Sequence, residues 1–219
     1  MRATMPRRVL IAGATGLVGC ELLREFVRDD DVVEARVLVR RPLDRAPVAS
    51  KVRELVADFD ALGAHPEWFR VDQVACALGT TIRKAGSQAA FRRVDFDYPM
   101  TIARLARSQV ARQFLLVSAV GADSRSRLFY SRVKGELEDA LRTVGYAALT
   151  IARPSFLTGP REEVRIGELL MKPLAHFLPA AWKPVTSRQV ASALVRAARS
   201  EKPGVEILEN ASLRREVAG

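Results

Sequence analysis

Short apolar runs alternate with amphipathic segments along the first two thirds of the chain, and this alternation predicts the fold. Six runs have the length and composition of buried strands. They cover residues 7–13, 34–40, 52–59, 71–80, 112–121 and 146–154. Between them, residues 16–29, 87–109 and 128–144 carry apolar side chains at helical spacing. Such an order predicts an α/β protein whose parallel sheet is covered by helices on both faces.

Prolines, glycines and capping residues mark where the predicted helices break, begin and end. The helix over 87–109 is expected to break near Tyr98 and Pro99, because the residue before a proline disfavours helical geometry. Gly145 follows the helix over 128–144 and suits a C-terminal cap. A later helix over 186–200 is expected to begin at a capping box made by Thr186 and Gln189.

The pattern changes after Pro154. Residues 162–178 are helical in pattern but disturbed at Pro173, and residues 204–210 are compatible with a last strand. The tail after residue 210 is expected to form a helical turn or to be disordered. Because no repeat or linker interrupts the chain, we expect a single domain over residues 1–219, with about 154–219 as a small lid at the edge of the sheet.

Composition adds limits on size and location. The chain has 219 residues, 48% of them hydrophobic, which suits one buried core and is short for two domains. No apolar run approaches the roughly 20 residues needed to span a bilayer. The basic start "MRATMPRR" leads into a strand-like run and a glycine turn, without the apolar stretch of a signal peptide. We therefore expect a cytoplasmic protein with no membrane span.

Charge and metal-ligating residues narrow the class of ligand. The net charge of +10 comes mostly from scattered arginines, with no basic run or base-stacking pattern that predicts specific nucleic-acid binding. Cys20 and Cys76 are the only cysteines, and His65 and His176 are isolated. No metal site is predicted from these four residues. The expected partner is a small-molecule substrate, and both a monomer and a homodimer stay open.

Three glycines, Gly13, Gly16 and Gly19, stand where the first strand turns into the first helix. In such a unit the first glycine permits a tight turn and the second lets the backbone approach a pyrophosphate. The third lets the helix pack closely on the strand, and free N–H groups at the helix start bind phosphate. Glycines alone also fit tight packing, but their position in a strand–turn–helix unit favours nucleotide binding.

The ends of the second and third strands suggest how the adenosine half of a dinucleotide is bound. Proteins that bind NAD carry an acidic residue for the ribose hydroxyls, whereas this chain has Arg40 and Arg41. Because guanidinium groups bind a 2′-phosphate, we favour NADP(H) over NAD(H). An arginine at a strand end is also common on plain surfaces. Asp58 and Phe59 close the third strand, where they suit an adenine amino group and ring or a simple loop.

Tyr130 and Lys134 are four residues apart in "YSRVKGELE" and therefore share one face of a helix. A free tyrosine is a poor base at neutral pH. A nearby ammonium and an oxidised nicotinamide both favour the phenolate. The spacing by itself is common in structural helices. It becomes more specific here because it follows a fifth strand that ends in "VSAVGAD".

These segments together resemble the short-chain dehydrogenase/reductase superfamily, in its atypical branch. Within that branch the chain is most similar to the oxidoreductase group named after the human Tat-interacting protein. The resemblance runs from Val9 to about Gly159. It rests on "GATGLVG", on "LGTT" followed by "AGSQAAFRRVDFDYP", on "LLVSAVGAD", on "YSRVKGELE" and on "ARPSFLTGPREE". It implies a three-layer Rossmann fold with a doubly wound parallel sheet, and bound NADP(H).

The resemblance also implies which residues meet each part of the cofactor. The residues implied for the pyrophosphate are Gly13, Thr15, Gly16, Leu17, Val18 and Gly19. Those implied for the adenosine half are Arg40 with Arg41 at the 2′-phosphate, Asp58 and Phe59 at the adenine, and Leu78, Gly79 and Thr80. Those implied for the nicotinamide half are Ser118, Tyr130 and Lys134, with Pro154, Phe156 and Leu157 beyond them.

The chain departs from the superfamily's pattern at two positions. The catalytic serine often stands second in a Ser-Ser pair, and here the pair reads Ser118-Ala119. Ser118 could take its place, or Ser124 or Ser126 could reach in. Asp95 falls near the position where many relatives carry an asparagine in a proton relay. The sequence therefore predicts cofactor binding more firmly than catalysis.

Three functions stay open. The first is an NADP(H)-dependent oxidoreductase for a small carbonyl or alcohol, with Tyr130 moving the proton, Lys134 assisting and Ser118 orienting the oxygen. The second is a non-catalytic NADP(H)-binding redox sensor or assembly partner, which the alanine at position 119 favours. The third, a nucleic-acid-binding module, has only the basic charge in its favour. Hydrolases are disfavoured, because the chain has no GxSxG, HExxH or GxxxxGK[ST] motif.

Overall fold

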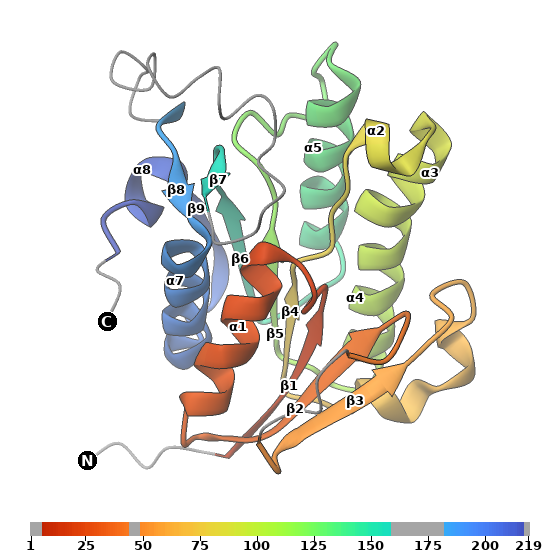
Figure 1. Ribbon diagram of the computed structural model, residues 1–219, viewed down its shortest axis with the longest axis vertical. Helices are drawn as coiled ribbons and strands as arrows, with labels where there is room; N and C mark the ends of the chain where they lie inside the picture. Colours follow the sequence, from red (N-terminus) through yellow and green to blue (C-terminus); the bar gives the residue numbers. More distant parts are fainter. Residues whose placement is uncertain (1–5, 44–48, 159–181, 217–219) are drawn as a thin grey trace.

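The central sheet consists of parallel strands, as the computed structural model of the chain shows (Figure 1). The structure describes residues 6–43, 49–158 and 182–216. Within them, the strands of this sheet stand in the order β3-β2-β1-β4-β5-β6-β9. Their bounds are β1 (Arg7–Ala12), β2 (Val32–Val39), β3 (Val52–Val56), β4 (Gln73–Cys76), β5 (Gln113–Val117), β6 (Ala148–Arg153) and β9 (Gly204–Glu209). All six predicted strands are confirmed, and residues 204–209 add the last strand.

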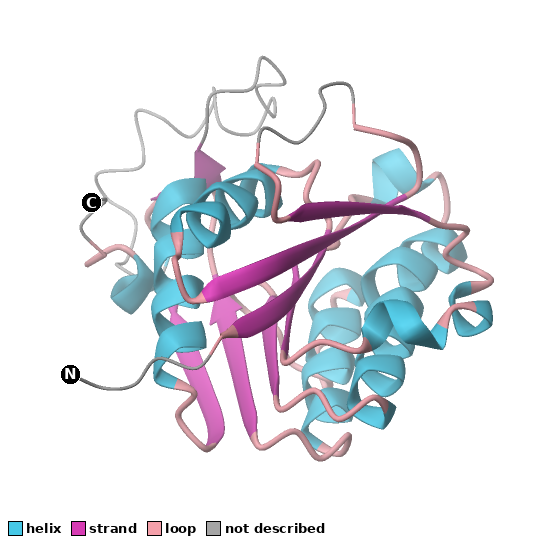
Figure 2. Cartoon of the chain, turned by 90° about the horizontal axis from the view of Figure 1, so that it is seen from below, coloured by secondary structure: helices cyan, strands magenta, loops and turns pink. Residues whose placement is uncertain are grey.

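Helices cover both faces of the sheet, which makes the three layers that the sequence predicts (Figure 2). One face is covered by α1 (Leu17–Arg28) and α7 (Ser187–Ser200). The other is covered by α4 (Tyr98–Ser108) and α5 (Phe129–Arg142). Shorter helical segments are η1 (Leu62–Ala64), η2 (Pro66–Phe69), α2 (Ile82–Ala85), α3 (Gln88–Arg92), η3 (Arg93–Asp97) and α8 (Asn210–Leu213).

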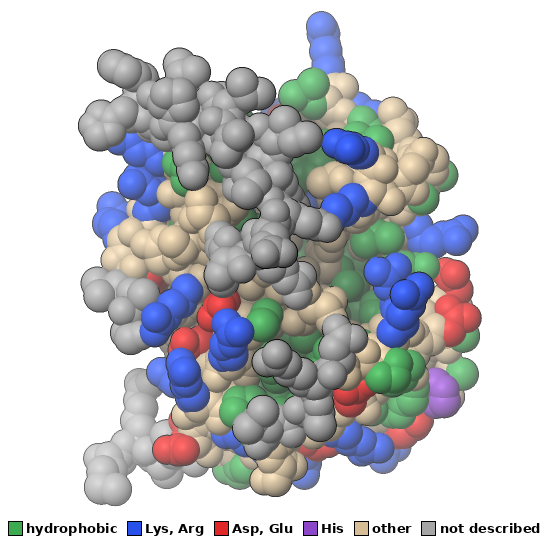
Figure 3. All heavy atoms as spheres, viewed as in Figure 1, with side chains coloured by type: hydrophobic (Ala, Val, Ile, Leu, Met, Phe, Trp, Pro, Cys, Tyr) green, Lys and Arg blue, Asp and Glu red, His purple; other side chains and the backbone are tan. Residues whose placement is uncertain are grey.

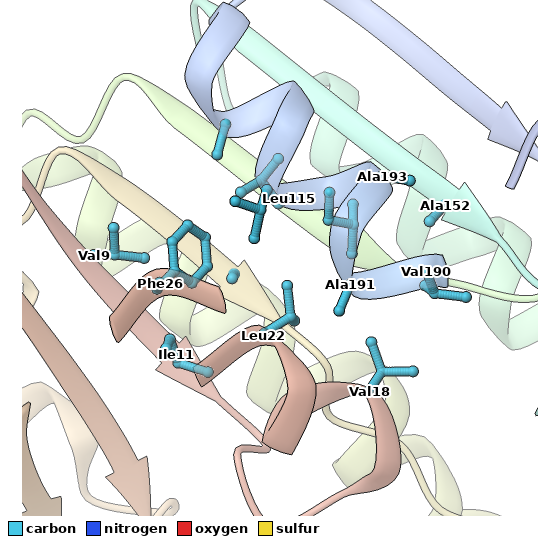
Figure 4. Packing of buried hydrophobic residues seen from close by; sticks show 14 of the residues in the cluster. Val9, Ile11, Val18, Leu22, Phe26, Leu115, Ala152, Val190, Ala191 and Ala193 are labelled. Carbon is cyan, nitrogen blue, oxygen red and sulfur yellow. The ribbon is translucent and has the colours of Figure 1, made fainter. Parts of the chain in front are cut away.

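Alternate residues of the strands feed two separate apolar cores. Ile11 of β1 and Leu115 of β5 lie under Leu22 of α1 and Val190 of α7 on one face (Figure 4). Their sequence neighbours point to the opposite face and join the core that α4 and α5 cover. Because side chains alternate along a strand, both faces are apolar only when the strand is apolar throughout. That requirement explains the near-continuous apolar runs in the sequence.

The predicted break near Pro99 takes the form of a π-helical turn. The turn is η3, and α4 continues directly from it. Proline has no N–H to give to the carbonyl of Asp95, four residues earlier. A π turn uses i→i+5 hydrogen bonds and therefore accommodates the missing donor without ending the helix. The chain changes helix type here instead of breaking.

The described part of the predicted lid joins the central fold. Within residues 154–219, α7 packs beside α1 and β9 pairs with β6. A two-stranded parallel ladder joins β7 (Leu157–Thr158) to β8 (Val185–Thr186). The predicted capping box at Thr186 and Gln189 is confirmed. The helical pattern over 162–178 lies outside the described residues.

Candidate functional site

The predicted site residues follow the strands at their carboxyl ends, which share one edge because the strands are parallel. The chain passes from β1 outward through β2 and β3, then returns to β4 on the other side of β1. In open α/β sheets, ligands bind in the crevice at such a point of reversal. The glycine turn after β1 and the segment Leu78–Thr80 after β4 lie on its two sides.

The three glycines of the turn face different surroundings. Gly13 has a φ of +89°, and a Cβ there would lie 2.6 Å from the carbonyl of Ala77. A Cβ on Gly19 would lie 2.0 Å from the oxygen of Gly13. Gly16 would meet only the Gly13 oxygen, at 3.2 Å. Packing therefore requires glycine at 13 and 19, whereas at Gly16 the absent side chain leaves space for an outside group.

The start of α1 fits a phosphate group. Gly16 precedes the helix, no side chain caps it, and its first turn carries no acidic residue. The N–H groups of a first helical turn have no acceptor within the helix, and its dipole favours an anion. Thr15 is exposed, Leu17 is half-buried and Val18 is buried. Thus Leu17 and Val18 would contribute N–H groups, while the Thr15 side chain is open to a ligand.

The residues predicted for the adenosine half of a cofactor are only partly accessible. Arg40 and Arg41 are both exposed directly after β2. Asp58 is also exposed, and its Oδ1 accepts a hydrogen bond from the backbone N of Asp60 at 2.9 Å. Phe59, however, is only 6% exposed and packs its ring against Tyr98, with centroids 5.3 Å apart. The Phe59 ring belongs to the core and would have to leave it to cover an adenine.

Tyr130, Lys134 and Asp95 gather beside the end of β4. Lys134 Nζ lies 2.7 Å from Asp95 Oδ1, and both side chains are buried. Asp95 Oδ2 accepts a hydrogen bond from Thr80 N at 2.8 Å. Burial favours the neutral amine of Lys134, but the charges of Asp95 and Tyr130 outweigh it and raise the pKa of Lys134. The tyrosine is 38% exposed and packs beside Phe91.

Ser118 lies in a second buried network that the sequence did not reveal. Its Oγ donates a hydrogen bond to Glu138 Oε1 at 2.5 Å, and Glu138 is 1% exposed. Glu138 also pairs with Arg153 at 2.6 Å. The Ser118 hydroxyl hydrogen is thus directed to α5, and to polarise a substrate carbonyl it would have to leave Glu138. In the sequence, Glu138 could have been found from its position four residues after Lys134, which places both on the same helical face.

Ala119, Ser126 and the segment after β6 differ in burial and in their hydrogen bonds. Ala119 is 8% exposed. Ser126 Oγ accepts a hydrogen bond from Leu128 N at 3.2 Å, which shapes the loop before α5. Pro154 is buried and its carbonyl accepts from Val120 N. Phe156 is 40% exposed beside the half-buried Leu157 of β7.

Gly135, next to Lys134, has a packing role that the sequence did not reveal. A Cβ at this position would lie 2.1 Å from Ser124 N and 2.3 Å from the carbonyl carbon of Asp123. The loop after β5 therefore packs directly on α5, next to Lys134. In the sequence, this packing was indicated only by a glycine inside a helical pattern, which often has a packing reason.

The distribution of basic side chains among the described residues can be followed on one face of the molecule (Figure 3). Figure 3 shows Lys and Arg side chains spread over several elements on the face in view. In the same part of the chain, no helix is long and apolar enough to cross a membrane. No group of three or more His, Cys, Asp or Glu side chains there could hold a metal ion.

The chain is similar to several curated proteins and solved structures, among them two curated relatives and one enzyme structure. Protein HTATIP2 of Rattus norvegicus is 35% identical over 94% of this chain and 88% of its own length. The mitochondrial protein FMP52 of Candida albicans is 29% identical over 82% of each. The Bordetella bronchiseptica enzyme WbmG in complex with NAD has a TM-score of 0.70 at 14% identity, covering 95% of this chain and 74% of that one. No protein-family model matches the chain.

The sequence identity to HTATIP2 is high enough to assign a family. The similarity to WbmG shows the fold alone. The structural similarity to WbmG confirms the Rossmann-type arrangement of a parallel sheet between helices. The name of the fungal relative places that protein in mitochondria, which does not fit the cytoplasmic location expected from this sequence. The location of this chain therefore stays a prediction.

Proposed function

Since this chain belongs to the HTATIP2 group of atypical short-chain dehydrogenases/reductases, we propose that it is an oxidoreductase that binds a nicotinamide dinucleotide. The cofactor would lie along the carboxyl edge of the sheet, and hydride would pass between it and a small carbonyl or alcohol. One observation carries the proposal. The exposed Tyr130 stands one helical turn from the buried Lys134, at the same edge as the glycine turn.

In this proposal the chain's own residues bind the cofactor and move one proton. The N–H groups at the start of α1 hold the pyrophosphate, and the absent side chain of Gly16 admits it. Lys134 has three donors, of which one meets Asp95, so two are left for a ribose hydroxyl and for stabilising a phenolate. The Tyr130 hydroxyl gives its proton to a carbonyl oxygen or, in the reverse direction, the Tyr130 phenolate takes a proton from an alcohol. When bound beside Tyr130 and Lys134, the dinucleotide would supply or accept the hydride.

The first test is calorimetric titration of the purified, cofactor-stripped protein with NADPH and then NADH. We expect binding of NADPH and weaker binding of NADH. If neither dinucleotide binds, the glycine turn serves packing alone and the proposal is wrong. Comparison with NADH is essential, because the WbmG structure with the same fold was solved with NAD.

We assign the preference for NADP(H) to Arg40. A charge-assisted hydrogen bond contributes roughly 1.5–3 kcal/mol, so Arg40→Glu should weaken NADPH binding about tenfold or more. NADH lacks the 2′-phosphate, and its affinity should change little. Arg104→Glu is the matched control, since Arg104 is also exposed but lies on α4. Equal losses for both cofactors in the Arg40 variant would contradict the assignment.

The role of Tyr130 is tested by Tyr130→Phe in a screen of carbonyl and alcohol substrates. Loss of the phenolic proton should reduce kcat by roughly 10²–10⁴-fold, because proton transfer by a positioned side chain contributes about that much. Cofactor affinity should be retained. Unchanged turnover in this variant would remove Tyr130 from the chemistry.

A second candidate is a non-catalytic NADP(H)-binding protein that senses redox state or assembles with a partner. Two observations favour it: alanine occupies position 119, and the Ser118 hydroxyl is bound to Glu138. The two functions differ in one result. A protein that binds NADPH, turns over no substrate in the screen and keeps its function in Tyr130→Phe fits the second candidate.

A further inference from the structure

Asp95 and Lys134 form an ion pair that is nearly closed to solvent. Their side chains are 0% and 5% exposed, and Thr80 N holds the second carboxylate oxygen. A Cβ on Gly79 would lie 3.6 Å from Asp95 Oδ1 and 3.8 Å from Lys134 Nζ. The pair therefore lies against the backbone that follows β4, within the proposed cofactor site.

The titratable groups around Lys134 come from three elements. Asp95 contributes a carboxylate from η3, and Tyr130 a phenol from α5. Cys76 of β4 contributes a thiol whose pKa is raised to about 11 by burial, so it is uncharged at neutral pH. Glu138, one turn further along α5, is already paired with Arg153 at 2.6 Å. Asp95 is thus the anion that lies in contact with the Lys134 ammonium in the described structure.

The oxidation state of a nicotinamide is also a state of charge. The oxidised ring carries one positive charge, and the reduced ring is neutral. In a buried site a nearby ammonium repels the oxidised ring far more strongly than it would in water. A neutral ammonium–carboxylate pair exerts much less repulsion.

We propose that Asp95 sets the balance between oxidised and reduced cofactor, by cancelling the charge of Lys134 where the nicotinamide binds. The inference rests on the proposed function and goes beyond it, since it assigns a specificity-determining role to a residue outside the Tyr–Lys pair. It concerns binding, and it holds whether or not the protein turns over a substrate.

The test is the ratio of the dissociation constants of NADP⁺ and NADPH for the wild type and for Asp95→Asn. The amide keeps an acceptor for Thr80 N but leaves the ammonium uncompensated. At about pH 6 the ratio should rise about tenfold or more, toward the reduced cofactor. Titration of the 2′-phosphate affects both forms alike and cancels in the ratio.

The dependence of this ratio on pH gives a second readout. Without Asp95, burial favours the neutral amine and lowers the pKa of Lys134 below the usual value of about 10.4. The added charge should therefore fade as the pH rises to about 9, and the variant's ratio should approach that of the wild type. The wild-type ratio should change much less over this range, because its pair stays neutral.

Asp72→Asn is the matched control. Asp72 immediately precedes β4 at the opposite edge of the sheet, and its Oδ2 accepts a hydrogen bond from Arg8 N at 2.7 Å. The same chemical change there should leave the ratio unaltered. If Asp95→Asn also leaves it within about twofold at both pH values, the inference is overturned. If the wild type binds neither cofactor, the proposed function fails first.

A reciprocal pair of variants tests the same charge balance from the side of Lys134. Removing both partners of a buried ion pair is often tolerated where removing one is not. Lys134→Met keeps the carboxylate, whereas the double variant Asp95→Asn/Lys134→Met has neither charge. The single variant should favour NADP⁺ over NADPH relative to the double variant. Equal ratios in these two proteins would overturn the inference.

Discussion

At the scale of single residues, the three glycines of the turn after β1 differ in what surrounds them. Gly13 and Gly19 are required by the protein's own backbone, since a Cβ would lie 2.6 Å from Ala77 and 2.0 Å from Gly13 respectively. Gly16 has an ordinary extended conformation, with φ of −81° and ψ of 171°. Of the three positions in this turn, Gly16 is therefore the one where the fold tolerates an added Cβ best.

This difference predicts opposite results for two alanine substitutions. Gly16→Ala should fold with a small loss of stability and lose most of its NADPH affinity, because the methyl group fills the space open to the pyrophosphate. Gly19→Ala should instead lower the free energy of unfolding by several kcal/mol, by overpacking. Urea denaturation and calorimetric titration separate the two effects. A Gly16→Ala protein that binds NADPH as the wild type does would contradict the placement of the pyrophosphate.

At the scale of elements, α7 has the most fully formed start of the helices described. Thr186 Oγ1 accepts a hydrogen bond from Gln189 N at 3.1 Å, and Gln189 Oε1 accepts one from Thr186 N at 3.0 Å. Gln189 also donates to the carbonyl of Arg214, which joins α8 to the helix. Because α7 covers one face of the sheet beside α1, the hydrogen bonds at its first turn help to position this helix layer.

Thr186→Ala should lower the free energy of unfolding by about 1 kcal/mol, since it leaves N–H groups of the first turn without a partner. The measurement is urea denaturation at neutral pH. Thr143→Ala is the control at a helix end. The Thr143 hydroxyl only donates back to the carbonyl of Ala140 in its own helix, and removing it should cost less. A loss for Thr186→Ala no larger than that for Thr143→Ala would show that the capping box is not what holds α7.

At the scale of the whole molecule, a buried carboxylate ties distant parts of the chain at the amino edge of the sheet. Asp29 is 4% exposed and binds Arg7 of β1 at 2.8 Å and Arg199 of α7 at 2.9 Å. Lys51 also donates to its backbone carbonyl. Burial favours the protonated acid, but hydrogen bonds from Arg199 and Asp31, with the arginine charges, hold the pKa of Asp29 below its usual value.

The lowered pKa gives a pH dependence with a definite sign. The ionised Asp29 stabilises the fold fully above its unfolded value, about 3.9, and the contribution is lost as the pH falls through the lower folded value. Asp29→Asn should reduce the free energy of unfolding by about 3 kcal/mol at neutral pH, and by less below about pH 3. Urea denaturation over this range checks it. Asp139→Asn, an exposed control 61% accessible, should change stability little.

The order of elements and the main motifs were predictable because they are local. Strand and helix periodicity, the glycine turn and the spacing of Tyr130 and Lys134 depend on residues within one or two turns of each other. The structure confirms the strands, the parallel sheet and the capping box of α7. It changes the expected break at Pro99 into a π turn. Where the cofactor lies on this framework stays a prediction.

By itself the sequence determined a parallel sheet between helix layers, a turn suited to phosphate, and a tyrosine and a lysine on one face of a helix. Only the tertiary structure decided which polar groups meet inside. It directs Ser118 to Glu138, buries Phe59 against Tyr98 and joins Lys134 to Asp95. These contacts link different elements, and no local periodicity relates their positions. A buried polar group must take whichever partner the packing brings within reach, because leaving it unpaired costs too much.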